Sequence, residues 1–230
     1  MFDLGPSYVP LPPELADARV RLRPPRFADF RAWLTVREKS RAFLEPWEPT
    51  WESDMLTRAG YRKRVRLMVG DWRDDRGYAF HIFDRADQSL VGGVNLTGVR
   101  RRAAQYASLG YWMGVDQAGH GLMSAALRVL LPAAFQTFGL HRVEAACIPE
   151  NAPSRALLAK FGFRAIGVAR SYLRIDGAWR DHILHELQAD DLMASRGMAG
   201  VAAEKRAGAP AREDAAPIAA EQGAIVDRQV

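Results

Sequence analysis

The sequence predicts a mixed α/β domain, of the α+β kind, in which a mostly antiparallel central sheet is flanked by helices. Strand-like alternation and helix-like periodicity replace one another along residues 18–192. Three of the strand patterns follow each other with only short polar breaks, as in an antiparallel meander. Later, Asp176 and Gly177 separate two more strand patterns, and this dipeptide favours a hairpin because both residues tolerate a positive φ.

The first strand is expected at Arg19–Arg23, where Val20 and Leu22 alternate with arginines. Phe27–Glu38 is expected to be a helix, because its apolar residues recur at helical spacing. A segment rich in tryptophan and proline, residues 43–52, follows this helix and is expected to be a loop.

A long basic helix is expected next, ending near Asp71. Ser53 or Asp54 is expected to cap it, because both side chains can accept hydrogen bonds from the free N–H groups of a first turn. The three strands of the meander are then expected at Tyr78–Phe83, Leu90–Val99 and Gln105–Met113.

In the second half, a helix is expected at Gly119–Phe138, and Pro132 within it predicts a bend. Arg142–Ile148 is predicted to be a strand, and Ser154–Lys160 a short helix that Gly162 ends. The two hairpin strands are expected at about Ala169–Ile175 and Trp179–Leu187.

The composition excludes several classes of protein. Of 230 residues, 48% are hydrophobic and 26% are charged, which excludes disorder throughout the chain. No apolar run approaches the roughly 20 residues that a membrane-spanning helix needs, and the start shows no basic segment followed by an apolar one. The single Cys147 cannot form an internal disulfide, so a cytoplasmic location is expected.

The composition divides the chain into three segments. Residues 1–17 contain several prolines and are expected to be an extended lead-in, and residues 18–192 form one domain. Residues 193–230 are rich in alanine, glycine and balanced charges. We expect this tail to be disordered or loosely helical, because it has too little apolar surface to offset chain entropy.

The chain is basic, with a net charge of +5 and only four lysines among 32 basic residues. Two interpretations stay open. The arginine excess reflects the codon bias of a GC-rich genome, or a basic face meets the phosphates of a nucleotide or of ribosomal RNA. The same choice applies to the basic helix around Arg58–Arg66, which is either a solvated face or a contact for RNA or an acidic protein.

The most informative segment is residues 109–127, in which a strand, a short loop with Gly119 and Gly121, and a helix follow one another. Glycines let a backbone approach a ligand closely, and the free N–H groups of a helix start favour a phosphate. The alternative is a tight turn. The loop is not a dinucleotide fingerprint, since a third glycine and a parallel βαβ context are not expected, and it is not a Walker loop.

A second segment places Asn151 and Ser154 where a strand gives way to a helix, which then stops at Phe161-Gly162-Phe163. Either polar residue could simply cap the helix. That interpretation does not explain why the segment occurs together with the glycine loop upstream.

Together the two segments resemble the acetyl-CoA signature of the GNAT N-acetyltransferases, over roughly residues 18–190. The resemblance implies a GNAT fold with a splayed pair of strands, acetyl-CoA as co-substrate, and direct attack of an amine on the thioester. Ala118 stands where the family usually has Gln or Arg, and Met123 where it has Gly or Ala. The implied cofactor-binding residues are Met113, Val115, Ala118, Gly119, His120, Gly121, Leu122, Met123, Asn151 and Ser154.

Further stretches, notably residues 43–49 and 172–182, are similar to the RimJ-type ribosomal-protein alanine acetyltransferases. This likeness implies that the acceptor is a protein N-terminus, specifically the N-terminal alanine of a small-subunit ribosomal protein. Two rivals are a GNAT enzyme acting on a small amine or antibiotic, and a non-catalytic module that binds the ribosome or RNA.

Acetyl transfer to an amine needs a neutral nucleophile and a donor for the leaving thiolate. A protein α-amine, with a pKa of about 7.7–8.0, needs only modest help from a base. Many relatives place a tyrosine at the position of Leu158, so Ser154 is the candidate donor, its alternatives being a helix cap or a pantetheine contact. Glu48 and Glu45 are the candidate bases, and the alternative for Glu48 is a solvated loop carboxylate.

The acceptor end is expected to involve Glu45, Trp47, Glu48 and His182. A plain core role is the alternative for Trp47, and pairing with Asp181 is the alternative for His182. The histidines are scattered without ligand spacing, so no metal site is expected.

Overall fold

The computed structural model describes residues 14–192 and the backbone of residues 219–220. One sheet runs through it in the order β1-β2-β3-β4-β5-β6-β8-β7, with β9 paired to β5. The strands are β1 (Leu15–Ala16), β2 (Val20–Arg23), β3 (Gly77–Asp84), β4 (Leu90–Arg100), β5 (Tyr106–Met113), β6 (Arg142–Cys147), β7 (Arg164–Ile175), β8 (Ala178–Gln188) and β9 (Ala219–Ala220).

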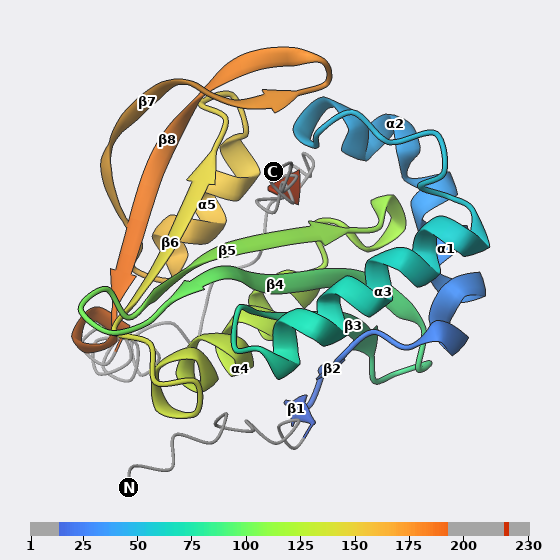
Figure 1. Ribbon diagram of the computed structural model, residues 1–230, viewed down its shortest axis with the longest axis horizontal. Coiled ribbons are helices and arrows are strands. Elements are labelled where there is room, and N and C mark those ends of the chain that lie inside the picture. The colour runs from blue at the N-terminus through green and yellow to red at the C-terminus, as the bar shows by residue number, and fades with distance from the viewer. Residues whose placement is uncertain (1–13, 193–218, 221–230) are drawn as a thin grey trace, which may run out of the picture.

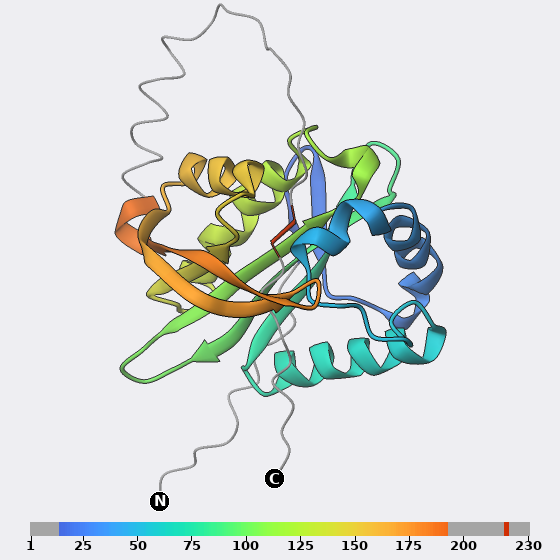
Figure 2. The ribbon, with the colours of Figure 1, turned by 90° about the horizontal axis from the view of Figure 1, so that it is seen from above.

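Helices cover both faces of this sheet (Figures 1 and 2). They are α1 (Phe30–Lys39), α2 (Arg41–Leu44), α3 (Arg58–Arg73), α4 (Leu122–Gln136) and α5 (Ala152–Lys160), with 3-10 turns at Phe27–Asp29, Glu45–Trp47 and Val115–Gln117. Figure 2 shows α1 and α3 on one face of the sheet and α4 and α5 on the other. The predicted mixed architecture is therefore confirmed.

The antiparallel meander is present as predicted. β2, β3, β4 and β5 pair in turn, each antiparallel to the next. Val20 and Leu22 are fully buried while Arg21 and Arg23 are not, as expected for a strand with one face on the core. The meander forms one half of the sheet and presents β5 to the second half.

The second half begins with a parallel step that was not expected from the sequence. β5 and β6 are parallel neighbours, and α4 connects them, so the glycine loop does lie in a βαβ unit. The pairing covers only Tyr106–Ser108 of β5 against Arg142–Glu144 of β6. Beyond Ser108 the two strands splay apart, and there Ala219–Ala220 of β9 pairs with Tyr111 and Trp112.

The β7–β8 hairpin is confirmed, with Asp176 and Gly177 at φ values of 46° and 76°. β7 starts at Arg164, earlier than predicted. At the tip, the backbone N–H of Asp176 donates to the carbonyl oxygen of Glu48 at 3.0 Å. This bond joins the hairpin to the segment that follows α1.

Two local predictions in the first half were wrong. Residues 43–52 are not all loop, because α2 runs to Leu44 and Glu45–Trp47 forms a 3-10 turn. Thr57 caps α3, and the predicted Ser53 and Asp54 do not. The hydroxyl of Thr57 accepts a hydrogen bond from the N–H of Gly60 at 3.0 Å. A β-branched threonine caps a helix with the same chemistry as serine, so the periodicity alone did not separate the candidates.

Two apolar clusters hold the layers together. The larger one packs α4 and α5 against the sheet and includes Leu127 and Leu158, both fully buried. The smaller one packs Trp33 of α1 and Tyr61 of α3 against Trp112 of β5. Within the described residues, no helix is both long enough and apolar enough to cross a membrane.

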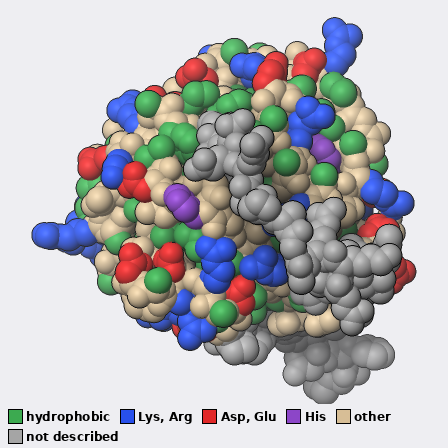
Figure 3. All heavy atoms as spheres, turned by 180° about the vertical axis from the view of Figure 1, so that it is seen from behind, with side chains coloured by type: hydrophobic (Ala, Val, Ile, Leu, Met, Phe, Trp, Pro, Cys, Tyr) green, Lys and Arg blue, Asp and Glu red, His purple; other side chains and the backbone are tan. Residues whose placement is uncertain are grey.

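Three arginines of α3 contact aromatic rings of the same domain. Arg62 and Arg66 both lie over the ring of Phe27, and Arg58 lies over Phe30. Such cation–π contacts give these arginines partners within the chain, and the contact of this helix with RNA stays a prediction. On the opposite face, the uncovered surface in Figure 3 intersperses basic, acidic and apolar side chains.

Candidate active site

The glycine loop before α4 forms one wall of a cavity of about 250 Å³. Gly119 and Gly121 have φ values of 79° and 75°, which glycine alone adopts without strain. No described side chain caps α4, so the loop leads straight into an open helix start at Leu122. The lining residues are Met113, Gln117, Gly119, Gly121, Leu122, Met123, Ser124, Pro153, Ala156, Leu157 and Lys160.

Five of the predicted cofactor residues line this cavity: Met113, Gly119, Gly121, Leu122 and Met123. The remaining five lie beside it in sequence but are not lining residues: Val115, Ala118, His120, Asn151 and Ser154. The amide of Val115 is already engaged, since it donates to the hydroxyl of Ser40 at 3.0 Å. An open helix start next to two left-handed glycines suits a pyrophosphate group.

Two cations, one at the glycine loop and one lining the cavity, were not predicted from the sequence. Arg19, just before β2, donates to the carbonyl oxygen of His120 at 2.7 Å, across 101 positions of sequence. A Cβ placed on Gly121 would lie 3.2 Å from its Nη1 atom. On the other side, the Nζ atom of Lys160 donates to the hydroxyl of Ser124 at 3.3 Å. No local sequence signal connects either residue to the loop.

Arg19→Ala should raise the KM for acetyl-CoA by about tenfold and leave kcat within twofold, because one charged hydrogen bond to a phosphate contributes about 1.5–3 kcal/mol at most. Steady-state kinetics at fixed acceptor concentration would measure both constants. Arg21→Ala is the matched control, since that side chain lies over Phe83 and pairs with Glu14. Equal effects of the two variants would contradict a specific role for Arg19.

A buried hydroxyl pair lies where β5 and β6 splay. The Tyr111 and Ser154 hydroxyl oxygens are 2.7 Å apart, and both residues are almost fully buried. Burial raises the pKa of Tyr111, so its phenol stays protonated. No role was predicted for Tyr111, although strand alternation, which puts it on the same face as Met113, was an available signal.

The structure separates the two interpretations of the α5 start. Asn151 is the cap, because its side-chain oxygen accepts the N–H of Ser154 at 3.1 Å. The hydroxyl of Ser154 is therefore not needed as a cap and is directed to Tyr111 instead. Leu158 is fully buried in the core, so no tyrosine is available from that turn of α5.

Cys147 lies beside this pair at the end of β6 and is buried. Burial raises the pKa of its thiol to about 11, and Ser154 is its hydrogen-bond neighbour. The thiol is thus protonated at neutral pH, which does not suit a nucleophile.

Glu48 is not the solvated loop carboxylate that one interpretation expected, since only 1% of it is exposed. Its two oxygens accept from the guanidinium of Arg37 at 2.8 and 2.5 Å, and Oε2 also accepts from the indole N–H of Trp51 at 2.7 Å. Arg37 in turn lies between the rings of Trp51 and Trp112. The cluster fixes the segment after α1 against the sheet.

The other predicted acceptor-side residues lie around this segment. Glu45 pairs with Arg41 at 2.7 Å on the surface, and Trp47 is partly buried against the smaller apolar cluster. His182 on β8 is buried, and its Nδ1 atom is 3.0 Å from the carbonyl oxygen of Arg180. The Asp181 carboxylate accepts the N–H of Ser171, and its interaction with His182 is electrostatic.

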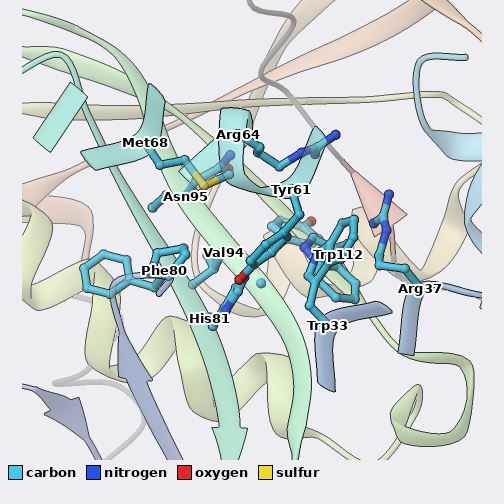
Figure 4. A pocket seen from close by; sticks show the side chains of 14 residues that line it. Trp33, Arg37, Tyr61, Arg64, Met68, Phe80, His81, Val94, Asn95 and Trp112 are labelled. Carbon is cyan, nitrogen blue, oxygen red and sulfur yellow. The ribbon is translucent and has the colours of Figure 1, made fainter. Parts of the chain in front are cut away.

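A second cavity, between the sheet and helices α1 and α3, is much smaller, at about 30 Å³ (Figure 4). Tyr61, Trp33 and Trp112 lie close together at one end of it, and His81 lies beside Tyr61. His81 contacts Asp29 at 3.2 Å, and burial lowers its pKa. This volume holds about one water, so we assign the region to packing.

Among the described residues, no group of three His, Cys, Asp or Glu side chains could hold a metal ion. The site consists of the cavity at the start of α4, a splayed strand pair and a hydroxyl pair at the gap.

A glycine loop at a helix start, together with a splayed pair of parallel strands, is typical of proteins that bind a phosphate-bearing cofactor. The phosphates bind at the helix start, and the extended arm of the cofactor lies between the two strands. The family model described as an acetyltransferase (GNAT) domain matches residues 19–164. The chain belongs to the GNAT acetyltransferase family. It is an N-acetyltransferase whose co-substrate is acetyl-CoA.

Three relatives show how close the similarity is. The chain is 35% identical over 173 residues to a probable N-acetyltransferase, YjcK, of Bacillus subtilis, covering 75% of this chain and 96% of that one. It is 33% identical over 171 residues to the ribosomal protein uS5-alanine N-acetyltransferase of Escherichia coli, covering 74% and 85%. The solved structure of Mycobacterium smegmatis RimJ in complex with CoA-disulfide matches with 36% identity and a TM-score of 0.74, covering 80% and 89%.

Proposed function

We propose that the protein acetylates the α-amine at the N-terminus of another protein, and that its acceptor is the N-terminal alanine of a small-subunit ribosomal protein. The observation that carries this proposal is a contact beside the gap between β5 and β6. We call the place where the tip of the β7–β8 hairpin meets residues 45–51 the frame. The hairpin tip at Asp176 is bonded to the backbone of Glu48, so β7–β8 and the Glu45–Trp51 segment meet. A frame of this kind admits the slender end of an extended chain more readily than a folded surface.

A further feature supports a peptide acceptor. The hairpin carries exposed aromatic side chains next to the frame, Tyr172 and Trp179, the latter 65% exposed. They offer apolar and stacking surface to the residues that follow an N-terminus.

The comparison proteins support the same acceptor. The Escherichia coli relative is named for the alanine of ribosomal protein uS5, and the mycobacterial structure bears the name RimJ. A protein α-amine also suits the site chemically, because about a tenth or more of it is neutral at pH 7, whereas a lysine is almost wholly charged.

In the proposed reaction, the amine nitrogen attacks the acetyl carbonyl directly and the thiolate leaves toward Ser154. The hydroxyl of Ser154 donates to the sulfur, while the protonated phenol of Tyr111 donates to Ser154. The phosphates lie at the start of α4 with Arg19 and Lys160 on either side. Glu48, whose oxygens already accept three hydrogen bonds, acts as a positioning residue for the frame.

Ser154→Ala should lower kcat by about 100-fold, the lower end of what a positioned proton donor contributes, and change the KM for acetyl-CoA by less than threefold. Asn151 still caps α5 in this variant, so the fold should persist. Tyr111→Phe is the companion variant and should cost about tenfold. The measurement is the pH-independent kcat from thiol release, and a Ser154→Ala enzyme with more than half of the wild-type kcat would contradict the donor role.

The acceptor class can be tested with three amines in a thiol-release assay. One is a short peptide that begins with alanine, the second is the same peptide with a blocked N-terminus and a free lysine, and the third is a small polyamine. Turnover on the first peptide alone is the expected result. Turnover on the polyamine alone would favour the small-amine alternative.

A further inference from the structure

The registers of the sheet place His182 at the reaction gap. β8 pairs with β6 as far as Ile183 opposite Cys147, and His182 is the next residue along β8. Extending the parallel register of Ser108 with Glu144 by three residues sets Tyr111 opposite Cys147, across the gap. His182 is therefore one strand position beyond Ile183, the residue that pairs with Cys147 at the position of Tyr111 along the gap.

His182 faces the acceptor side of that gap. Cys147 and Leu187 belong to the cluster beneath α4 and α5, and Ile183 shares their face of the sheet. Successive side chains of a strand alternate between faces, so His182 lies on the face of α1 and α3. Ser154 and His182 thus lie on opposite faces of the sheet, an arrangement that leaves separate places for a thiolate donor and for a base that acts on the amine.

The ring of His182 is fixed in one tautomer. A carbonyl oxygen can only accept, so Nδ1, at 3.0 Å from the oxygen of Arg180, carries the proton and Nε2 has a lone pair. Burial lowers the pKa of His182, which keeps the ring neutral at pH 7. Its other neighbours are the ring of Tyr172 at 5.7 Å and the charges of Arg180 and Asp181.

The carboxylates near the frame are less suitable for this task. Both oxygens of Glu48 already accept from Arg37 or Trp51. Glu45 pairs with Arg41 on the surface. A base needs a lone pair that is not already engaged, and the neutral imidazole of His182 has one at Nε2.

We propose that Nε2 of His182 is the general base that takes the proton of the acceptor α-amine. This inference rests on the function proposed above. As the C–N bond forms and the C–S bond breaks, the amine proton passes to Nε2 and the sulfur takes a proton along the Tyr111–Ser154 pair. Nε2 then gives its proton to water, and water restores the hydroxyl pair.

His182→Asn tests the proposal, because an asparagine amide can still donate to the carbonyl of Arg180 but has no imidazole lone pair. At pH 7, kcat/KM for an alanine-starting peptide should fall by about 30-fold, less than the usual 10²–10⁴ because an α-amine is already partly neutral. The deficit should persist as the pH rises through the pKa of the amine, because the neutral amine still has to lose a proton when it attacks. Free imidazole should restore activity to His182→Ala by at least about fivefold.

His185→Asn is the matched control. Its Nδ1 atom is 3.0 Å from the carbonyl of Ile183 on the same strand, and burial also lowers its pKa, but it lies on the opposite face of the sheet. Its kcat/KM should stay within twofold of wild type, and calorimetry should show that His182→Asn binds acetyl-CoA as wild type does.

The outcomes separate this inference from the proposed function. If the wild type acetylates the peptide and His182→Asn keeps more than half of its kcat/KM, His182 is not the base and the proposed function stands. Loss of acetyl-CoA binding in both His182 variants, without rescue by imidazole, would assign the residue a structural role and overturn the inference. No turnover of any peptide by the wild type would overturn the proposed function itself.

Discussion

Gly121→Glu should raise the Kd for acetyl-CoA by about 1,000-fold, or about 4 kcal/mol. Gly121 precedes α4 with a φ of 75°, so any other residue there carries strain of roughly 1–2 kcal/mol. The larger effect is electrostatic, because the new carboxylate would lie beside Arg19, where the phosphates are expected, and would repel them. Isothermal titration calorimetry with acetyl-CoA measures the difference directly.

Gly121→Ala separates strain from charge at this position. It has the same positive φ and the same close approach to Arg19, but it adds no charge. We expect it to lower stability by roughly 1–2 kcal/mol and to weaken acetyl-CoA binding by less than about tenfold. Glutamate and alanine variants with the same Kd would contradict the placement of the phosphates at the start of α4.

Glu48→Ala should destabilise the fold by about 3–5 kcal/mol, a large share of the roughly 5–15 kcal/mol that a domain has. The change leaves the guanidinium of Arg37 buried without its carboxylate, and it removes the acceptor for the Trp51 indole. Urea denaturation measures the loss as a lower midpoint with an unchanged slope.

Glu45→Ala is the control for Glu48, because its pair with Arg41 is largely exposed and should be worth less than about 1 kcal/mol. The pair of variants also separates two roles. A Glu48→Ala protein that unfolds at the wild-type midpoint but has lost its kcat would identify Glu48 as a base and contradict the positioning role.

The regular elements could be predicted because their signals are local. Val20 and Leu22 alternate with arginines over four residues, and Asp176-Gly177 specifies its own turn. The parallel step between β5 and β6 could not be predicted in this way, because the strands that pair are separated by the whole of α4. The cap of α3 was misplaced for a smaller reason: Ser53, Asp54 and Thr57 have the same capping chemistry.

The same distinction between local and long-range signals applies to the residues of the site. Gly119, Gly121 and Asn151 lie in contiguous motifs and could be selected from the sequence, and the structure puts both glycines on the cavity. Arg19 meets the loop across 101 positions and Tyr111 meets Ser154 across 43, so only the fold brings them together. The burial of Glu48 likewise depends on packing, since its partner Arg37 lies in α1 while Glu48 follows the 3-10 turn after α2.

The most direct test of the account is to locate the transferred group on a natural acceptor. Small-subunit ribosomal proteins without N-terminal acetylation would be incubated with the enzyme and isotopically labelled acetyl-CoA, and the label would be mapped by mass spectrometry of the peptides. The account predicts label on the α-amine of a protein that begins with alanine, and none on lysine side chains. Label on lysines, or none on any ribosomal protein while a small amine is acetylated, would contradict it.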